Sequence, residues 1–176
     1  HFGLIRFFAH TSSPLVTAQP ADTYKLGPLA HNPPFLYHYL LSFLYRFIGL
    51  FTKSVEIQVI CLRFANIALA VTGLVVMHKL LRLIGLSRAL ANVTVLIFAL
   101  TPMMTTVSAQ INYDNMLLPA TSLCLYVTVV FVRKLDKIRF DARDLLFLLS
   151  LCLFSSLIKF AVLPIFAAIA AIVSWR

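Results

Sequence analysis

The chain has 176 residues, of which 61% are hydrophobic and 12% charged, and its mean hydropathy is +0.93. A soluble domain carries about 25% charged residues, and a disordered chain is poor in aromatic residues, whereas this chain has 15 Phe and 6 Tyr. At about 20 apolar residues per crossing, the length allows roughly four to six membrane spans. The composition excludes a disordered chain and a large soluble domain, and predicts an all-α integral membrane protein in contact with the lipid bilayer.

The formal net charge is +9, but its distribution argues against nucleic acid as a partner. Basic nucleic-acid-binding domains gather their cations on a soluble face, whereas here Lys and Arg stand at the ends of apolar runs. Cys61, Cys124 and Cys152 are each isolated in an apolar stretch, which indicates buried thiols and neither a zinc site nor a disulfide framework. Because the chain starts at His1 and stops at Arg176 directly after an apolar run, we expect a segment of a longer protein, truncated at both ends.

Residues 1–59 are expected to form a loop region on the outer side of the membrane that contains one interfacial helix. Residues 1–33 carry several prolines and a Thr-Ser-Ser run, which is typical of irregular structure. From 34 to 51 the chain is apolar and aromatic, but polar residues recur every four positions: His38, Ser42 and Arg46. That polar face favours a helix lying in the membrane interface; a true span with the same stripe against protein is the alternative.

Residues 60–176 are expected to form a polytopic transmembrane helical bundle in a single domain. The apolar runs predict spans at about 60–77, 91–108, 116–132, 145–158 and 161–175. The first of them has a stripe of small and polar residues, which suits close packing between helices: Arg63, Asn66, Ala70 and Gly73. The last apolar stretch, 145–175, is too long for one ordinary crossing and is interrupted by Lys159 and Pro164. Two short helices therefore fit it better than one, although both arrangements remain open.

The distribution of Lys and Arg predicts the orientation of the chain in the membrane. Cytoplasmic loops carry an excess of these residues, and the connections 79–88 and 133–144 are the basic ones. With both of them in the cytoplasm, region 1–59, the loop 110–115 and the turn at Lys159 face the opposite side. The sequence therefore predicts that the polar chemistry of the chain gathers at the outer face.

Three residues on that face are candidates for chemistry. His31 is held before two prolines at the membrane surface, where a plain helix-start signal is the other interpretation. Asp114 is the one acid between Glu56 and Asp136, and a carboxylate at a membrane boundary is costly without water, a cation or a function; a helix cap is its structural alternative. Lys159 can either reach the surface with its long side chain or supply a cation to a lipid phosphate.

The order of these elements resembles a known enzyme family. The matching segments are HNPPFLY at 31–37, RFAN at 63–66, the loop from Ser108 to Asp114, and LIKF at 157–160. Together they resemble the GT-C glycosyltransferases, with the protein O-mannosyltransferase and aminoarabinose-transferase branch as the closest relatives. The resemblance implies a bacterial plasma-membrane enzyme that transfers a sugar from a polyprenyl-phosphate donor to an acceptor on the outer face.

The resemblance also implies roles for individual residues. Asp114 corresponds to the second outer-loop acid, while the main catalytic acid is expected before His1, so this segment alone is expected to be inactive. The residues expected to bind substrate are His31, Arg63, Asn112, Tyr113 and Lys159. A divalent metal cofactor stays open, and no spacing in the sequence names the sugar or the acceptor.

Two other classes of protein compete with this interpretation. A transporter or flippase-like protein would show inverted repeats and ionisable residues deep inside its spans. A non-catalytic membrane scaffold would use its outer loops only to bind partners. An Asp-Glu pair upstream of His1 would favour the transferase over the scaffold.

Overall fold

The computed structural model describes residues 1–11, 35–136 and 142–175, and these residues form helices and no strand. The all-helical class is therefore confirmed for this part of the chain. The helices are α1 (Phe2–Thr11), α3 (Phe35–Phe51), α4 (Val55–Leu83), α5 (Arg88–Leu100), α6 (Pro102–Ser108), α7 (Asp114–Leu135), α8 (Ala142–Ile158), a 3-10 turn (Phe160–Val162) and α9 (Leu163–Trp175).

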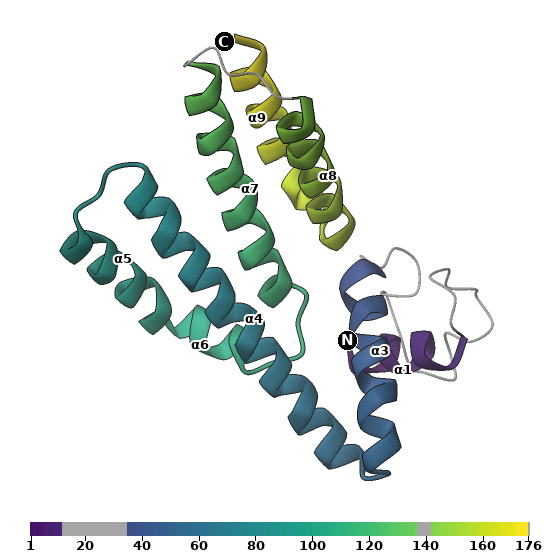
Figure 1. Ribbon diagram of the computed structural model, residues 1–176. Helices are drawn as coiled ribbons and strands as arrows, with labels where there is room; N and C mark the ends of the chain where they lie inside the picture. The colour runs from purple at the N-terminus through teal and green to yellow at the C-terminus, as the bar shows by residue number, and fades with distance from the viewer. Residues whose placement is uncertain (12–34, 137–141, 176) are drawn as a thin grey trace.

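Helix α7 lies at the centre of the arrangement, with α4 on one side and α8 and α9 on the other (Figure 1). α4 and α7 run in parallel, because the intervening α5 and α6 return the chain to the level of Asn66, near the middle of α4. α7 and α8 run antiparallel, and pairs along their length record the register: Asp114 with Lys159, Cys124 with Cys152, and Lys134 with Asp144.

Two helices, α4 and α7, are long and apolar enough to cross a membrane, and the pair α5 and α6 makes a third candidate if it counts as one span. α4 has 29 residues, roughly 43 Å at 1.5 Å per residue, so it exceeds the roughly 30 Å hydrocarbon core of a bilayer. It begins at Val55, before the start at 60 that the sequence predicts. α8 and α9, with 17 and 13 residues, are shorter than these candidates.

The segment expected to form a span at 91–108 is bent, because the chain turns by 67° between α5 and α6. Thr101 has an extended backbone, with ψ at 135°, and Pro102 follows at the first turn of α6. The proline has no N–H to continue the ladder of α5 and disfavours helical geometry at the residue before it. The bend therefore follows from the covalent structure of Pro102, which lacks an N–H and restricts the residue before it.

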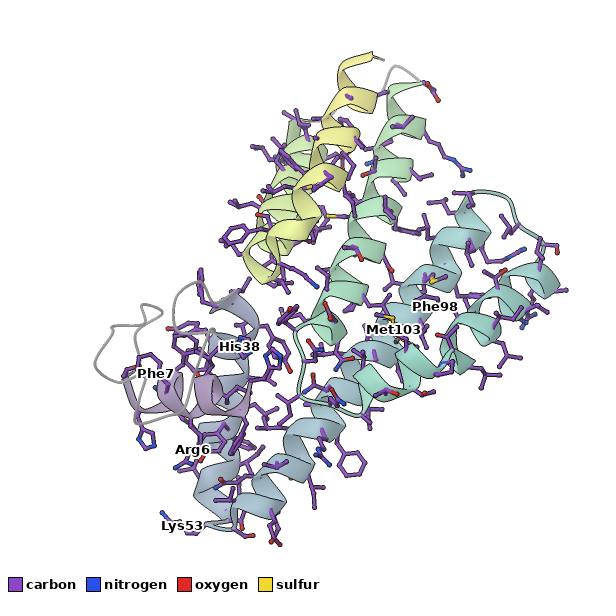
Figure 2. All side chains as sticks on the ribbon, turned by 180° about the vertical axis from the view of Figure 1, so that it is seen from behind. Arg6, Phe7, His38, Lys53, Phe98 and Met103 are labelled. Carbon is purple, nitrogen blue, oxygen red and sulfur yellow. The ribbon has the colours of Figure 1, made fainter. Side chains whose placement is uncertain are left out.

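The polar stripe of α3 does not face water, as a helix lying in the membrane interface would place it. His38 is fully buried and Ser42 nearly so, and the Arg46 guanidinium donates to the Ala9 and Phe8 carbonyls of α1 at 2.8 and 3.0 Å. α1 covers this face, and His38 lies beside it in Figure 2. The stripe faces protein because the end of α1 offers carbonyl groups that need hydrogen-bond donors.

The outward surfaces of several helices are apolar. On α5 only Ala91 is buried among the described side chains, and α3 and α4 expose aromatic residues. Exposed examples are Phe43, Phe47, Phe51, Phe64, Leu96 and Ile97. Soluble monomers rarely expose contiguous apolar patches of this extent, so these surfaces suit contact with a lipid bilayer.

Close contact between α4 and α7 is possible because Gly73 has no side chain. A Cβ atom built at Gly73 would lie 2.6 Å from Leu118 Cγ and 2.9 Å from the Pro119 backbone nitrogen. Small residues at such positions let helix backbones approach and gain van der Waals contact. This contact fixes the position of the first turns of α7, where the polar residues gather.

Candidate functional site at the start of helix α7

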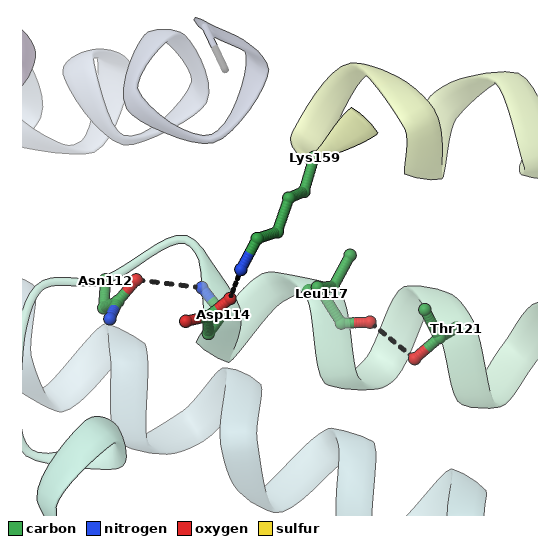
Figure 3. Close-up of polar contacts among 5 residues, drawn as sticks. All are labelled: Asn112, Asp114, Leu117, Thr121 and Lys159. Carbon is green, nitrogen blue, oxygen red and sulfur yellow. Dashed lines mark hydrogen bonds and ion pairs between the residues drawn. The ribbon is translucent and has the colours of Figure 1, made fainter. Parts of the chain in front are cut away.

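An ion pair joins the start of α7 to the break after α8. Lys159 Nζ lies 2.9 Å from Asp114 Oδ1, and each side chain is about one-third exposed, at 33% and 32%. Figure 3 shows the lysine reaching from the end of α8 toward the carboxylate at the first residue of α7. Two residues that the sequence selects separately, 45 positions apart, thus form one charged site.

The loop before α7 positions the carboxylate. Asn112 Oδ1 accepts a hydrogen bond from the Asp114 backbone N–H at 3.2 Å (Figure 3), the geometry of an Asx turn. Asp114 then occupies the first turn of α7, where the helix dipole favours a negative charge. Its side chain is therefore held by the turn on one side and by Lys159 on the other.

Tyr113 supplies an aromatic surface under the cation. Lys159 Nζ lies 4.8 Å from the centroid of its ring, within the range of a cation–π interaction. The same ring makes an edge contact with His1, with centroids 5.3 Å apart, and lies 6.3 Å from His38. His1 Nδ1 and His38 Nε2 are 2.9 Å apart, so a pair made of an exposed and a buried histidine borders the site.

The hydrogen bond with Asp114 raises the pKa of Lys159 above its ordinary value of 10.5. A raised folded-state pKa means that the pair's contribution to stability is fully present below pH 10.5 and is lost as the pH rises above it. The ammonium group therefore stays charged throughout the physiological range. Because both side chains are partly exposed, the pair contributes about 1 kcal/mol or less to folding.

A cavity of about 370 Å³ opens beside the ion pair, between α7 and the bent segment α5–α6. Its polar lining comes from Asp114, Asn115 and Lys159, with Thr101 and Thr121 farther away along the helices. The rest of its lining is apolar: Phe98, Met103, Met104, Val107, Leu117 and Leu118. Figure 2 shows Phe98 and Met103 next to each other at the bend. The cavity therefore has one charged end and an apolar body.

Of the other residues selected from the sequence, His31 lies outside the described residues and Arg63 is separate from the pair. Arg63 is exposed on α4, and within the described part of the chain no hydrogen bond or ion pair links it to Asp114 or Lys159. Asn66, Ala70 and Gly73, the other members of the stripe that the sequence predicts, are buried, so Arg63 is the exposed member of that stripe.

A buried polar network behind the site is not among the predicted site residues. Tyr37 on α3 donates its hydroxyl to Asn66 Oδ1 on α4 at 2.6 Å, and Asn115 Nδ2 on α7 donates to the same oxygen at 3.0 Å. Burial raises the pKa of Tyr37, which keeps the phenol protonated as a donor. The available signal was Asn66, a polar residue within an apolar stretch.

Replacing Asn66 by leucine is expected to destabilise the fold by about 2 kcal/mol. Tyr37 would lose its side-chain acceptor, and a buried donor without a partner costs about 1–3 kcal/mol. Asn115 would keep the Val107 and Gln110 carbonyls as acceptors. The free energy of unfolding in mixed micelles measures the effect.

The matched control for this prediction uses Tyr37→Phe, which removes the donor. In that background Asn66→Leu should cost at least 1 kcal/mol less, since no hydroxyl is left without a partner. Equal losses in the two backgrounds would contradict a role for the Tyr37–Asn66 hydrogen bond.

Within residues 1–11, 35–136 and 142–175, no group of three or more His, Cys, Asp or Glu side chains is placed to hold a metal ion. The fold and the site together define an all-helical chain with two or three helices that can span a membrane and a charged pair beside an apolar cavity. In comparisons with known proteins, the chain matches no family model, no curated protein and no solved structure.

Proposed function

We propose that the chain is part of a multi-pass membrane glycosyltransferase that moves a sugar from a polyprenyl-phosphate donor to an acceptor at the outer face of a bacterial plasma membrane. The observation that carries this proposal is the Asp114–Lys159 pair at the charged end of a cavity whose body is apolar. A lipid phosphate matches this cavity, because it has a charged head group and a hydrocarbon chain.

Lys159 supplies the cation for the donor's phosphate. When the bond between the anomeric carbon and the phosphate oxygen breaks, negative charge develops on the leaving polyprenyl phosphate. A fixed ammonium group in a poorly hydrated site stabilises that charge. The raised pKa of Lys159 supports this role, because the group stays protonated at neutral pH.

Asp114 orients the acceptor or a second carboxylate. The acceptor hydroxyl forms the new bond to the anomeric carbon and must lose its proton, which a carboxylate base accepts. Asp114 already neutralises Lys159, so binding of the donor phosphate would compete for the ammonium and release the carboxylate toward the acceptor. The main base in this proposal comes from outside the chain, as the family resemblance implies.

The positions of the basic loops support the proposed sidedness. The Arg133 guanidinium, near the end of α7, donates to the Leu83 carbonyl at the end of α4, so loops 79–88 and 133–144 begin at the same end of the molecule. Asp114 and Lys159 lie at the opposite end of α7. With basic loops in the cytoplasm, the ion pair faces the other side.

A flippase for a lipid phosphate is the second candidate, and the bend of 67° between α5 and α6 favours it. Interrupted spans next to a substrate site are typical of transporters. The two functions differ in their product, because a flippase moves the lipid without cleaving its sugar–phosphate bond.

The test is an assay of the complete protein in membranes with labelled polyprenyl-phosphate sugars. Asp114→Asn is expected to lower sugar transfer at least tenfold, since it removes the carboxylate that orients the acceptor in this proposal. The matched control is Asp144→Asn, which breaks the ion pair of 2.6 Å with Lys134 at the other end of α7 and α8. Transfer that is unchanged in Asp114→Asn, or equally reduced in both variants, would contradict the proposal, and movement of intact donor would favour the flippase.

A further inference from the structure

A second hollow lies between α4 and α5, away from the ion pair. It is a groove of about 490 Å³, and its apolar lining includes Val71, Val75, Leu96 and Ala99. Its volume is within the range of about 300–1,000 Å³ of small-molecule sites. Because α4 and α5 lie side by side on one arm of the molecule (Figure 1), the groove is bounded by α4, which can span a membrane, and by α5, which is a candidate span only together with α6.

The polarity of the groove changes along its length. Its apolar residues are followed, toward the turn between the two helices, by His78 on α4 and Asn92 on α5. His78 Nε2 and Asn92 Oδ1 lie 3.0 Å apart and join the helices across the groove. This pair marks the boundary between an apolar section and a polar end.

Two arginines continue the same helix faces beyond that boundary. Arg82 lies four residues after His78, and Arg88 lies four residues before Asn92, so each is one helical turn nearer the connecting turn. Both are exposed. Arg82 donates to the Leu86 carbonyl, which folds its guanidinium onto this turn.

The positive charge at this end has no acidic counterpart nearby in the sequence. Residues 57–113 contain no Asp or Glu, and within the described parts of the chain neither Arg82 nor Arg88 forms an ion pair with a carboxylate. Arg133 adds a third guanidinium through its hydrogen bond to the Leu83 carbonyl. The groove thus ends near three guanidinium groups, none of which forms an ion pair with a carboxylate within the described residues.

We propose that this groove binds an anionic phospholipid of the surrounding leaflet. The acyl chain lies along the apolar section, the ester region faces His78 and Asn92, and the phosphate lies between Arg82 and Arg88. Basic pockets between spans at the cytoplasmic side bind anionic headgroups in this way. A free phosphate would leave the apolar section empty, and a zwitterionic lipid would match the groove but not the positive charge of Arg82 and Arg88.

The test measures lipid binding to the purified full-length protein by native mass spectrometry. The probes are dioctanoyl phosphatidylglycerol, dioctanoyl phosphatidylcholine and glycerol 3-phosphate. The variant Arg82→Gln/Arg88→Gln removes the two cations at the groove. Its control, Arg6→Gln, removes an exposed arginine of α1 at the far side of the molecule (Figure 2).

We expect phosphatidylglycerol to bind the unaltered protein and Arg6→Gln equally, and the double variant about 25-fold more weakly, at about fivefold for each arginine. Phosphatidylcholine should bind all three proteins weakly and alike, and glycerol 3-phosphate should not bind. Undiminished phosphatidylglycerol binding in the double variant would overturn the proposal. So would equal affinity for the two lipids, or binding of glycerol 3-phosphate as tight as that of the lipid.

Discussion

Under the proposed function, replacing Lys159 by alanine is expected to lower sugar transfer by the full-length protein at least tenfold while membrane insertion persists. The substitution removes the ammonium group that lies 2.9 Å from Asp114 and that would stabilise the leaving phosphate. Removing one preorganised donor from a transition state costs roughly 100- to 1,000-fold in other enzymes, so tenfold is a lower bound. Initial rates with a labelled polyprenyl-phosphate sugar measure the effect.

Loss of stability cannot account for a decrease of this size. Both members of the pair are about one-third exposed, at 33% and 32%, and exposed pairs contribute about 1 kcal/mol or less. Lys134→Ala is the matched control, since it breaks the other α7–α8 ion pair, of 2.6 Å, far from the cavity. It should leave the rate within about twofold.

The conservative variant separates charge from shape at this position. Lys159→Arg keeps the cation but replaces a compact ammonium by a planar group, so it should recover part of the activity that alanine loses. Near-normal turnover in Lys159→Ala would remove Lys159 from the site. Equal losses in Lys159→Ala and Lys134→Ala would show that the ion pairs matter only for the α7–α8 hairpin.

Replacing Gly73 by leucine is expected to destabilise the protein by about 3 kcal/mol, the largest structural effect in the described chain. A Cβ atom at this position would lie 2.6 Å from Leu118 Cγ and 2.9 Å from the Pro119 backbone nitrogen. The leucine side chain opposite can rotate, but the Pro119 backbone cannot, so α4 and α7 must separate. Overpacking of this kind typically costs about 1–3 kcal/mol, and unfolding in mixed micelles measures it.

Gly49 provides the matched control for this prediction. A Cβ atom there would have its nearest neighbour, Gln58 Nε2, at 4.0 Å, which is ordinary contact. Gly49→Ala in α3 should therefore be neutral or stabilise by up to about 1 kcal/mol, through helix propensity, whereas Gly73→Ala should already destabilise. If both alanine variants behave alike, the close approach of α4 and α7 does not limit stability.

The sequence alone indicates both members of the charged pair, because an ionisable residue at a membrane boundary is unusual. Asp114 and Lys159 are isolated ionisable residues next to apolar runs, and each has a cost unless it finds a partner. The sequence predicts that both residues lie at the outer face, but it does not indicate the distance between their side chains. Their contact depends on the antiparallel register of α7 and α8, which the buried Cys124 and Cys152 side chains help to define.

The remaining features depend on contacts that periodicity does not encode. A polar stripe such as that of α3 looks the same whether water or another helix covers it, and here the carbonyl groups of α1 cover it. His31 stands out because of its prolines, whereas the histidines that border Tyr113 are His1 and His38. Pro102 is visible in the sequence and disfavours helical geometry at Thr101, but a proline alone does not specify the 67° angle of the bend.

The two ion pairs at opposite ends of the α7–α8 hairpin restrict how the site can open. A slide of α8 along α7 by one turn, about 5.4 Å, would separate Lys134 from Asp144 as well as Lys159 from Asp114. Lys159 itself has an extended backbone, with φ at −158°, between α8 and the 3-10 turn. Release of the ammonium toward a ligand needs only rotation about the side-chain torsions of Lys159, which would leave the pairing of α7 with α8 in place.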